Sequence, residues 1–170
     1  PRCRFHALAV SNAITTFGQQ MLHWTRDHLE RMGYRVIYGD TDSVFAVSGI
    51  SDAAEAERMG AAVVGRLNEA LGAWIAETYE VPSHLMLEFE RLYVRFFMPR
   101  LRHRPGGSKK RYAGIVGRGS RRELVFTGLE SVRRDWTLLA KDFQRHLLQR
   151  VFDQQEIEPF IVGFVRELRE

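Results

Sequence analysis

Two carboxylates near position 40 give this sequence its clearest capacity for chemistry. Asp40 and Asp42 lie between two short runs of β-favouring residues at 35–38 and 44–47. Gly39 and Asp40 favour a tight turn, because Gly tolerates positive φ and an Asp side chain can bond its own backbone. The pattern predicts a β-hairpin with both carboxylates at its tip, on one face if strand geometry extends that far. Such oxygen ligands suit Mg²⁺, whereas an Asp-x-Asp pair is also common as a plain solvated turn.

Three further segments follow this hairpin and contain charged and aromatic residues in compact patterns. The four segments read Tyr-Gly-Asp-Thr-Asp-Ser at 38–43, Leu-Glu-Phe-Glu-Arg at 87–91, Lys-Lys-Arg-Tyr-Ala-Gly at 109–114 and Gly-Leu-Glu-Ser-Val-Arg-Arg-Asp-Trp at 128–136. In this order they resemble motif C, the next palm strand, the KKRY motif and the palm-to-thumb junction of the family B DNA polymerases. The resemblance covers essentially the whole chain.

The resemblance implies an α+β fold. It consists of a polymerase palm-type antiparallel sheet with packed helices, followed by a helical thumb base. Residues 1–134 would form part of a palm domain, and residues 135–170 the start of the thumb. The implied activity of the complete enzyme is template-directed nucleotidyl transfer by a two-metal mechanism, in which two Mg²⁺ ions serve the primer hydroxyl and the leaving group.

The same resemblance assigns roles to the carboxylates. Asp42 would bridge the metals, and Asp40 would be an outer-shell or occasional ligand. Glu88 is a candidate third carboxylate, with a surface or salt-bridged strand residue as the alternative. The residues expected to support the turn are Tyr38, Gly39, Thr41 and Ser43.

A basic stretch indicates contact with nucleic acid. No acidic residue occurs between Glu90 and Glu123, while the interval holds eleven Lys and Arg residues, a one-sided charge typical of a nucleic-acid footprint or of a solvated basic face. By resemblance, Lys110 would reach the minor groove near the primer end, whose acceptors every base pair presents. The expected DNA-binding residues are Lys109, Lys110, Arg111, Tyr112, Arg133 and Arg134; the last two could instead cap a helix or pair with Glu130 and Asp135.

Composition is that of an ordinary globular chain. Of 170 residues, 45% are hydrophobic and 27% charged, and the net charge is +4. No apolar run reaches the ~20 residues that span a bilayer, and the single Cys3 excludes an intrachain disulfide. The expected partners are primer–template DNA and deoxynucleoside triphosphates, without a membrane, in a bacterial cytoplasm near the nucleoid. A sliding clamp is a further expected partner through regions outside this chain.

Two expected motifs of the family have no counterpart in this sequence. The family's motif A supplies the other metal-bridging aspartate, and motif B a lysine for the triphosphate; both precede motif C. The first 33 residues contain no Lys, and their only acids are Asp27 and Glu30. The chain alone is therefore expected to be inactive. A non-catalytic DNA-binding domain with a palm-like fold is the alternative. An unrelated Mg²⁺-dependent cyclase or phosphotransferase leaves the Lys-Lys-Arg-Tyr segment unexplained.

Hydrophobic periodicity predicts the elements that position these residues. The first half of the chain should form a helix over 5–32 capped by Gly33, a hairpin over 34–48 and a helix from Ser51 as N-cap to about 77. A bulged strand over 84–98 and a hairpin of strands 109–117 and 122–128 should follow. The chain should end in a helix from 135, with an inward stripe of Trp136, Leu139, Phe143, Leu147 and Val151, and in a last helix begun by Pro159, with Ile161, Phe164, Val165 and Leu168 inward.

Overall fold

The computed structural model describes residues 7–100, 110–117 and 122–169. Within these ranges the chain forms four α-helices, a short 3₁₀ helix and two antiparallel sheets, so the predicted α+β class is confirmed. The chain divides into two compact units, Pro1–Glu90 and Arg91–Glu170. Lys109 and several other predicted basic residues lie outside the described residues.

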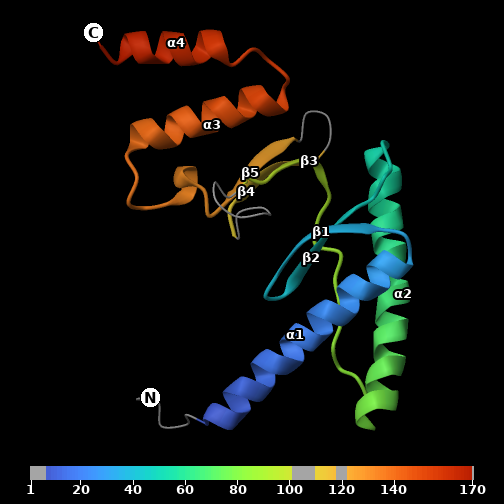
Figure 1. The fold of residues 1–170 in the computed structure, drawn as a ribbon. Helices are drawn as coiled ribbons and strands as arrows, with labels where there is room; N and C mark the ends of the chain where they lie inside the picture. The colour runs from blue at the N-terminus through green and yellow to red at the C-terminus, as the bar shows by residue number, and fades with distance from the viewer. Residues whose placement is uncertain (1–6, 101–109, 118–121, 170) are drawn as a thin grey trace. The chain divides into compact units, whose positions relative to one another are not determined.

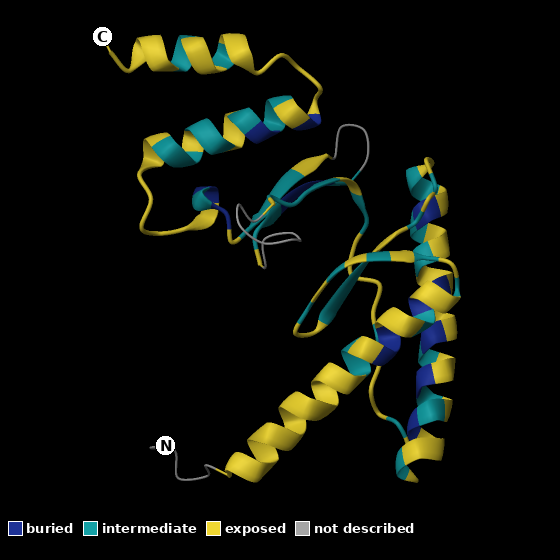
Figure 2. Cartoon of the chain, viewed as in Figure 1, coloured by how far each residue is buried: buried dark blue, intermediate teal, exposed yellow. Residues whose placement is uncertain are grey.

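The first unit is built from two long helices and a hairpin (Figure 1). Its elements are α1 (Leu8–Arg31), β1 (Arg35–Asp40), β2 (Ser43–Val47) and α2 (Ala53–Tyr79). The buried core joins the second half of α1 to α2 through Trp24, Leu29, Val63, Leu67, Leu71 and Ile75, and Val36 and Val44 of the hairpin pack against it. The first half of α1 is exposed throughout (Figure 2).

The first hairpin is flanked by the end of α1 and the start of α2, and the sequence predicted a capping residue at each. Gly33 follows α1 with φ +90°, which confirms the left-handed residue expected there. The N-cap of α2 is Asp52 rather than Ser51, because the Asp52 side chain accepts a hydrogen bond of 2.8 Å from the Glu55 amide. The prediction chose the wrong one of two adjacent capping residues.

The strand predicted over 84–98 is wrong in its first half. Only β3 (Tyr93–Phe97) is a strand, and 84–92 pairs with no strand of the described chain. The cause is Asn68 of α2, whose side chain donates to the Leu87 carbonyl (2.9 Å) and accepts from the Leu87 amide (2.7 Å). The backbone groups that a neighbouring strand would satisfy are therefore satisfied by a helix side chain.

The second unit packs a three-stranded sheet against a helix (Figure 1). The strands run in the order β3, β4 (Tyr112–Val116) and β5 (Glu123–Thr127), which confirms the second predicted hairpin. A 3₁₀ helix, η2 (Glu130–Val132), leads to α3 (Leu138–Phe152) and α4 (Glu158–Glu167). Ala113 and Ile115 of β4 form the core with Leu129, Leu148 and Phe152.

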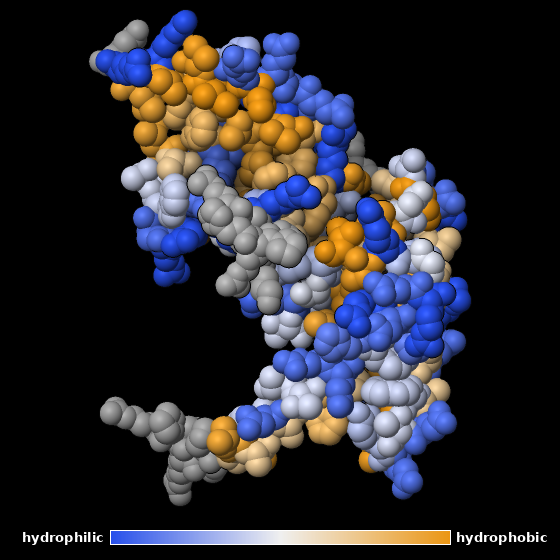
Figure 3. All heavy atoms as spheres, in the orientation of Figure 1, coloured by the Kyte–Doolittle hydropathy of each residue, from blue (hydrophilic) through white to orange (hydrophobic). Residues whose placement is uncertain are grey.

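The two last helices use other faces than the predicted stripes. Leu148 and Phe152 of α3 are buried on the sheet, whereas Trp136 and Leu139 are 42% and 48% exposed. Phe143 instead stacks on Phe160 of α4, with ring centroids 5.6 Å apart. Pro159 lies in the first turn of α4 as expected. Of the residues predicted to point inward there, Phe164 contacts Phe143, but Ile161, Val165 and Leu168 are exposed. Figure 3 shows a hydrophobic surface over the last two helices.

Candidate functional site

The carboxylates predicted at the hairpin tip lie in two different backbone settings. Asp40 ends β1 and pairs with Ser43, so the turn consists of Thr41 and Asp42 alone. Thr41 takes the positive φ of +42°, and Gly39 lies inside the strand opposite Val44. The predicted turn position of Gly39 is therefore wrong, and the alternation argument that placed both carboxylates on one face of a strand does not apply to Asp42.

Hydrogen bonds within the turn converge on Asp40. The Asp42 amide donates to the Asp40 carbonyl, the Ser43 hydroxyl donates to the same oxygen (3.3 Å), and the Thr41 hydroxyl donates to Asp40 Oδ1 (3.2 Å). Asp40 is half-buried, whereas Asp42 is exposed. Tyr38 faces its partner Phe45 across the ladder, with ring centroids 5.4 Å apart. The turn thus fixes the Asp40 carboxylate and presents that of Asp42 to solvent.

The oxygen donors at this tip fit Mg²⁺ chemically. Mg²⁺ is bound through one or two carboxylates together with waters and substrate phosphates, and the tip offers two carboxylates. Among the described residues, no group of three or more His, Cys, Asp or Glu side chains is placed to hold a metal. Glu88 lies in the extended segment clamped by Asn68 and is exposed. Its role as a third carboxylate stays a prediction.

The described part of the Lys-Lys-Arg-Tyr segment leads into β4. Lys110 is exposed with φ +58°, and Arg111 is half-buried. Both precede the strand, which begins at Tyr112, so the expectation of cations on a strand is wrong for them. Tyr112 joins Tyr93 and Phe96 in an aromatic cluster. Because Ala113 and Ile115 face the α3 core, pleat alternation places Tyr112 on the opposite face of the sheet.

Arg111 belongs to a polar network that the sequence did not predict. Its guanidinium pairs with Oε1 of Glu130 in η2, whose side chain is 15% exposed. Oε2 of Glu130 accepts a 2.6 Å hydrogen bond from Gln144 Nε2 of α3, and Gln144 Oε1 in turn accepts from the Ser131 amide at 2.7 Å. Gln144 lies four residues before the buried Leu148 and therefore on the same face of α3. A polar residue on a buried helix face was the sequence signal that could have revealed this network.

The network sets the ionisation of Glu130. Burial alone would raise the pKa of this carboxyl, but the hydrogen bonds from Gln144 and Arg111 and the positive charge of Arg111 lower it below its ordinary value of 4.5. The charged form is therefore the one that the fold stabilises.

A pH dependence of stability follows from this lowered pKa. Glu130 contributes stability that is present above its unfolded-state pKa and lost as pH falls through the folded-state pKa. We therefore expect the stability advantage of wild type over Glu130→Gln to be constant above pH 4.5 and to shrink below it. Urea titrations across pH measure this difference. The matched charge removal Glu123→Gln, at an exposed position, is the control; an advantage that grows on acidification would contradict the assignment.

The two junction arginines differ in their surroundings. Arg133 pairs with Asp135 through Nε–Oδ1 at 3.0 Å and Nη2–Oδ2 at 2.5 Å. This partner raises the pKa of Arg133 and lowers that of Asp135. The pairing alternative with Asp135 thus holds for Arg133, whereas Glu130 pairs with Arg111. Arg134 is exposed. DNA contact by either arginine stays a prediction.

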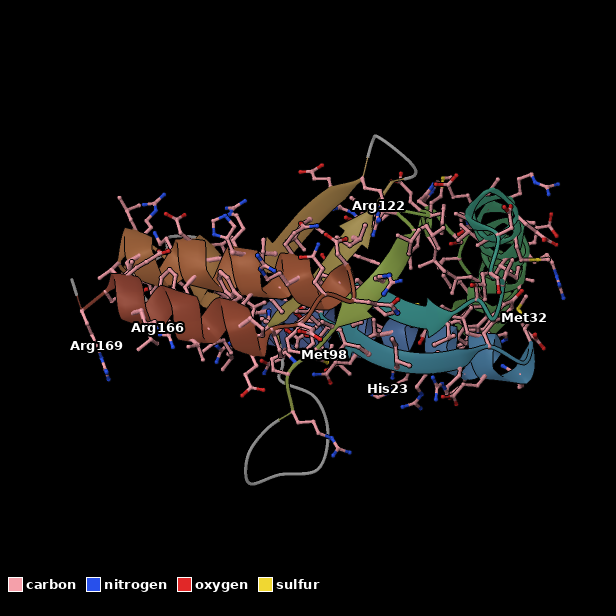
Figure 4. The ribbon with its side chains drawn as sticks, turned by 90° about the horizontal axis from the view of Figure 1, so that it is seen from above. His23, Met32, Met98, Arg122, Arg166 and Arg169 are labelled. Atoms are coloured by element: carbon pink, nitrogen blue, oxygen red, sulfur yellow. The ribbon has the colours of Figure 1, made fainter. Side chains whose placement is uncertain are left out.

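Part of the basic stretch is engaged within its own unit. Besides Arg111, Arg122 lies 3.9 Å from Asp153 at the end of α3, and Figure 4 shows Arg122 beside the start of β5. Further cations project from the end of α4, where Arg166 and Arg169 are labelled. Lys110, Arg95 and Arg100 are exposed.

Comparison with known proteins identifies the class to which these features belong. The family profile of DNA polymerase family B matches residues 2–170. The chain therefore belongs to DNA polymerase family B, as its four motifs predicted.

Individual relatives agree with this assignment. DNA polymerase II of Escherichia coli (strain K12) is 42% identical over 163 residues, which are 94% of this chain and 20% of that protein. The DNA polymerase of Pyrococcus horikoshii is 31% identical over 170 residues, 99% of this chain and 12% of that protein. That of Thermococcus gorgonarius is 29% identical, with 99% and 19% covered. These relatives include a bacterial DNA polymerase II, and the chain spans a fifth or less of their lengths.

No helix among the described residues has the length and apolar character needed to cross a bilayer.

Proposed function

We propose that this chain contributes the motif C hairpin and the KKRY segment to a DNA-directed DNA polymerase, which transfers nucleotides to a primer under the direction of a template. The observation that carries the proposal is the 42% identity to DNA polymerase II over nearly the whole chain, together with the two carboxylates at the hairpin tip. In this proposal residues 1–134 belong to the palm and 135–170 begin the thumb. The polymerase acts in the bacterial cytoplasm, on primer–template DNA and deoxynucleoside triphosphates.

The chain's own residues would divide the work as follows. Mg²⁺, when bound, activates the primer hydroxyl and stabilises the leaving group. Asp42, exposed at the tip, would hold it, and Asp40, fixed by Thr41 and Ser43, would support it from the end of β1. Lys110 and Tyr112 would contact the duplex product through its backbone and minor groove, without reading sequence.

The chain by itself should not extend a primer. The two-metal mechanism needs a second bridging carboxylate, and the sequence contains no counterpart of motif A. We expect no template-dependent incorporation by the purified chain in a primer-extension assay with Mg²⁺ or Mn²⁺. Incorporation that disappears in Asp42→Ala would show that the chain holds a complete site and would overturn this expectation.

DNA binding by the chain should be weak, independent of sequence and strongly dependent on salt. Each neutralised phosphate contributes about −0.9 to the slope of log affinity against log salt, so three engaged cations give a slope near −3. Lys110→Ala should weaken binding to all duplexes alike and make the slope shallower by about one unit. Fluorescence anisotropy over a salt series, with folding checked by circular dichroism, measures both.

The control for this measurement is Arg26→Ala on α1, which removes a cation paired with Asp27 outside the basic stretch. It should leave the slope unchanged. Affinity that does not vary with salt, or that prefers one sequence strongly, would contradict a duplex grip of the polymerase kind.

A further inference from the structure

Arg111 differs from its neighbours in the KKRY segment because its side chain pairs with Glu130. Arg111 lies between Lys110 and Tyr112, yet its guanidinium turns to Glu130. Both oxygens of that carboxylate are used, Oε1 by Arg111 and Oε2 by Gln144. Gln144 is itself held by the Ser131 amide. The start of β4 is thus tied to η2 and to α3 through one carboxylate.

The pairing with Glu130 limits what else Arg111 can bind, although the Arg111 side chain is 39% exposed. Its Nε is buried, and Nη2 is committed to Glu130. A phosphate that took the place of Glu130 at Nη2 would leave a carboxylate that is only 15% exposed without its cationic partner, which is costly. A role as a phosphate ligand therefore competes with the fold itself.

The backbone on either side of Arg111 is equally constrained. Lys110 has φ +58°, and its carbonyl oxygen lies so close to Gly128 that a Cβ added to Gly128 would overlap it. The Lys110 side chain is therefore attached to a strained backbone position, and such a conformation persists only where the surrounding structure holds it. The Arg111–Glu130 pair is a side-chain link directly next to this residue.

We infer that Glu130 is a positioning residue for DNA binding: through Arg111 it holds the segment that presents Lys110 and Tyr112, and Arg111 serves as the anchor of that segment instead of a phosphate ligand. The inference deepens the proposed function and rests on it, because Lys110 and Tyr112 are assigned to the duplex there. It replaces the expectation that Arg111 binds DNA directly.

The test uses Glu130→Gln, because long-range electrostatics and the positioning role predict opposite changes in DNA affinity for this variant. Glu130→Gln makes the chain more positive by one charge, which by long-range electrostatics alone favours DNA. If Glu130 positions the segment, the same variant should bind primer–template DNA about 3- to 10-fold more weakly, the factor that one lost net hydrogen bond corresponds to. The matched control Glu123→Gln removes one exposed charge at the start of β5 and should bind equally or more tightly.

A second measurement needs no DNA. Amide hydrogen exchange at Ala113 and Ile115 of β4 should be accelerated in Arg111→Gln and in Glu130→Gln, and the double variant should be no faster than either single variant, since both break the same link. If Glu130→Gln does not fold, Gln144→Met keeps all charges and removes only the tie to α3. It should weaken DNA binding in the same direction, whereas a phosphate-binding Arg111 predicts no change.

The outcomes separate this inference from the function on which it rests. Wild-type chain without salt-dependent DNA binding would overturn the proposed function, and the exchange measurement would still decide whether Glu130 anchors the strand. Binding by Glu130→Gln as tight as by Glu123→Gln, or additive exchange effects of the two single variants, would overturn the anchor.

Discussion

We expect Asp42→Ala to lower kcat for nucleotide incorporation by about 10³-fold or more in a polymerase that combines this chain with the family's remaining catalytic segments. A ligand that bridges metals supports several kcal/mol of transition-state stabilisation, and each ~1.4 kcal/mol corresponds to a factor of ten. DNA affinity should change little, because Asp42 lies at the hairpin tip and outside the basic stretch. Single-turnover incorporation measures the first quantity and anisotropy the second.

The matched control for this variant is Asp27→Ala, which removes an exposed carboxylate from α1 and should retain the wild-type rate. Asp40→Ala should fall between the two, since we propose an outer-shell role for Asp40. A rate within tenfold of wild type for Asp42→Ala would remove this residue from the metal site.

The second large effect concerns stability. Gly128→Ala should lower the free energy of unfolding by at least about 2 kcal/mol, because left-handed backbone costs a residue with a Cβ about 1–2 kcal/mol and a steric clash adds to that. Gly128 has φ +60°, and a Cβ would overlap the carbonyl of Lys110. The clash can be relieved only by moving backbone that leads directly into β4. Urea denaturation measures the loss.

Gly163→Ala tests whether this effect is specific to position 128. Gly163 lies in α4 of the same unit, and an added Cβ there meets nothing within 4 Å. Since Ala favours a helix over Gly, the control should be neutral or stabilising by up to about 1 kcal/mol. Equal losses in the two variants would mean that the close approach at Gly128 is tolerated.

Local patterns predicted those elements whose partners lie nearby in sequence. The hairpin of β1 and β2 and that of β4 and β5 each join adjacent segments, and their runs of β-favouring residues located them correctly. The segment 84–92 failed for a physical reason: its alternation is real, but Asn68, nineteen residues earlier, occupies the Leu87 backbone groups. Periodicity reports which residues are apolar and contains nothing about which group satisfies a backbone amide.

In the candidate site, too, local sequence patterns predicted some features, and contacts between distant residues determined the others. The carboxylates and the basic segment were found because their residue types and order resemble known motifs. The Glu130 network was missed because its members are separated by 14 and 19 residues, and each is unremarkable alone. The faces of α3 were likewise misassigned, because the apolar stripe that a single helix presents does not reveal that the helix has two neighbours, the sheet on one side and α4 on the other.

The exposed first half of α1 determines where local unfolding of this helix begins. Helix formation in water is marginal for short segments without tertiary support, and here Ala7 provides no side-chain cap and the first turn contains no acidic residue. Val10 and Ile14 are 57% and 68% exposed, so the winding of these turns depends on propensity alone. The helix should therefore unwind from its amino end in a graded manner and stop near Phe17, where side-chain contacts with α2 begin. The Phe17 ring lies 5.5 Å from that of Tyr79, and the Tyr79 hydroxyl donates a 2.9 Å hydrogen bond to Gln20 Oε1. Amides before that point would exchange through fraying, and those after it only through opening of the core.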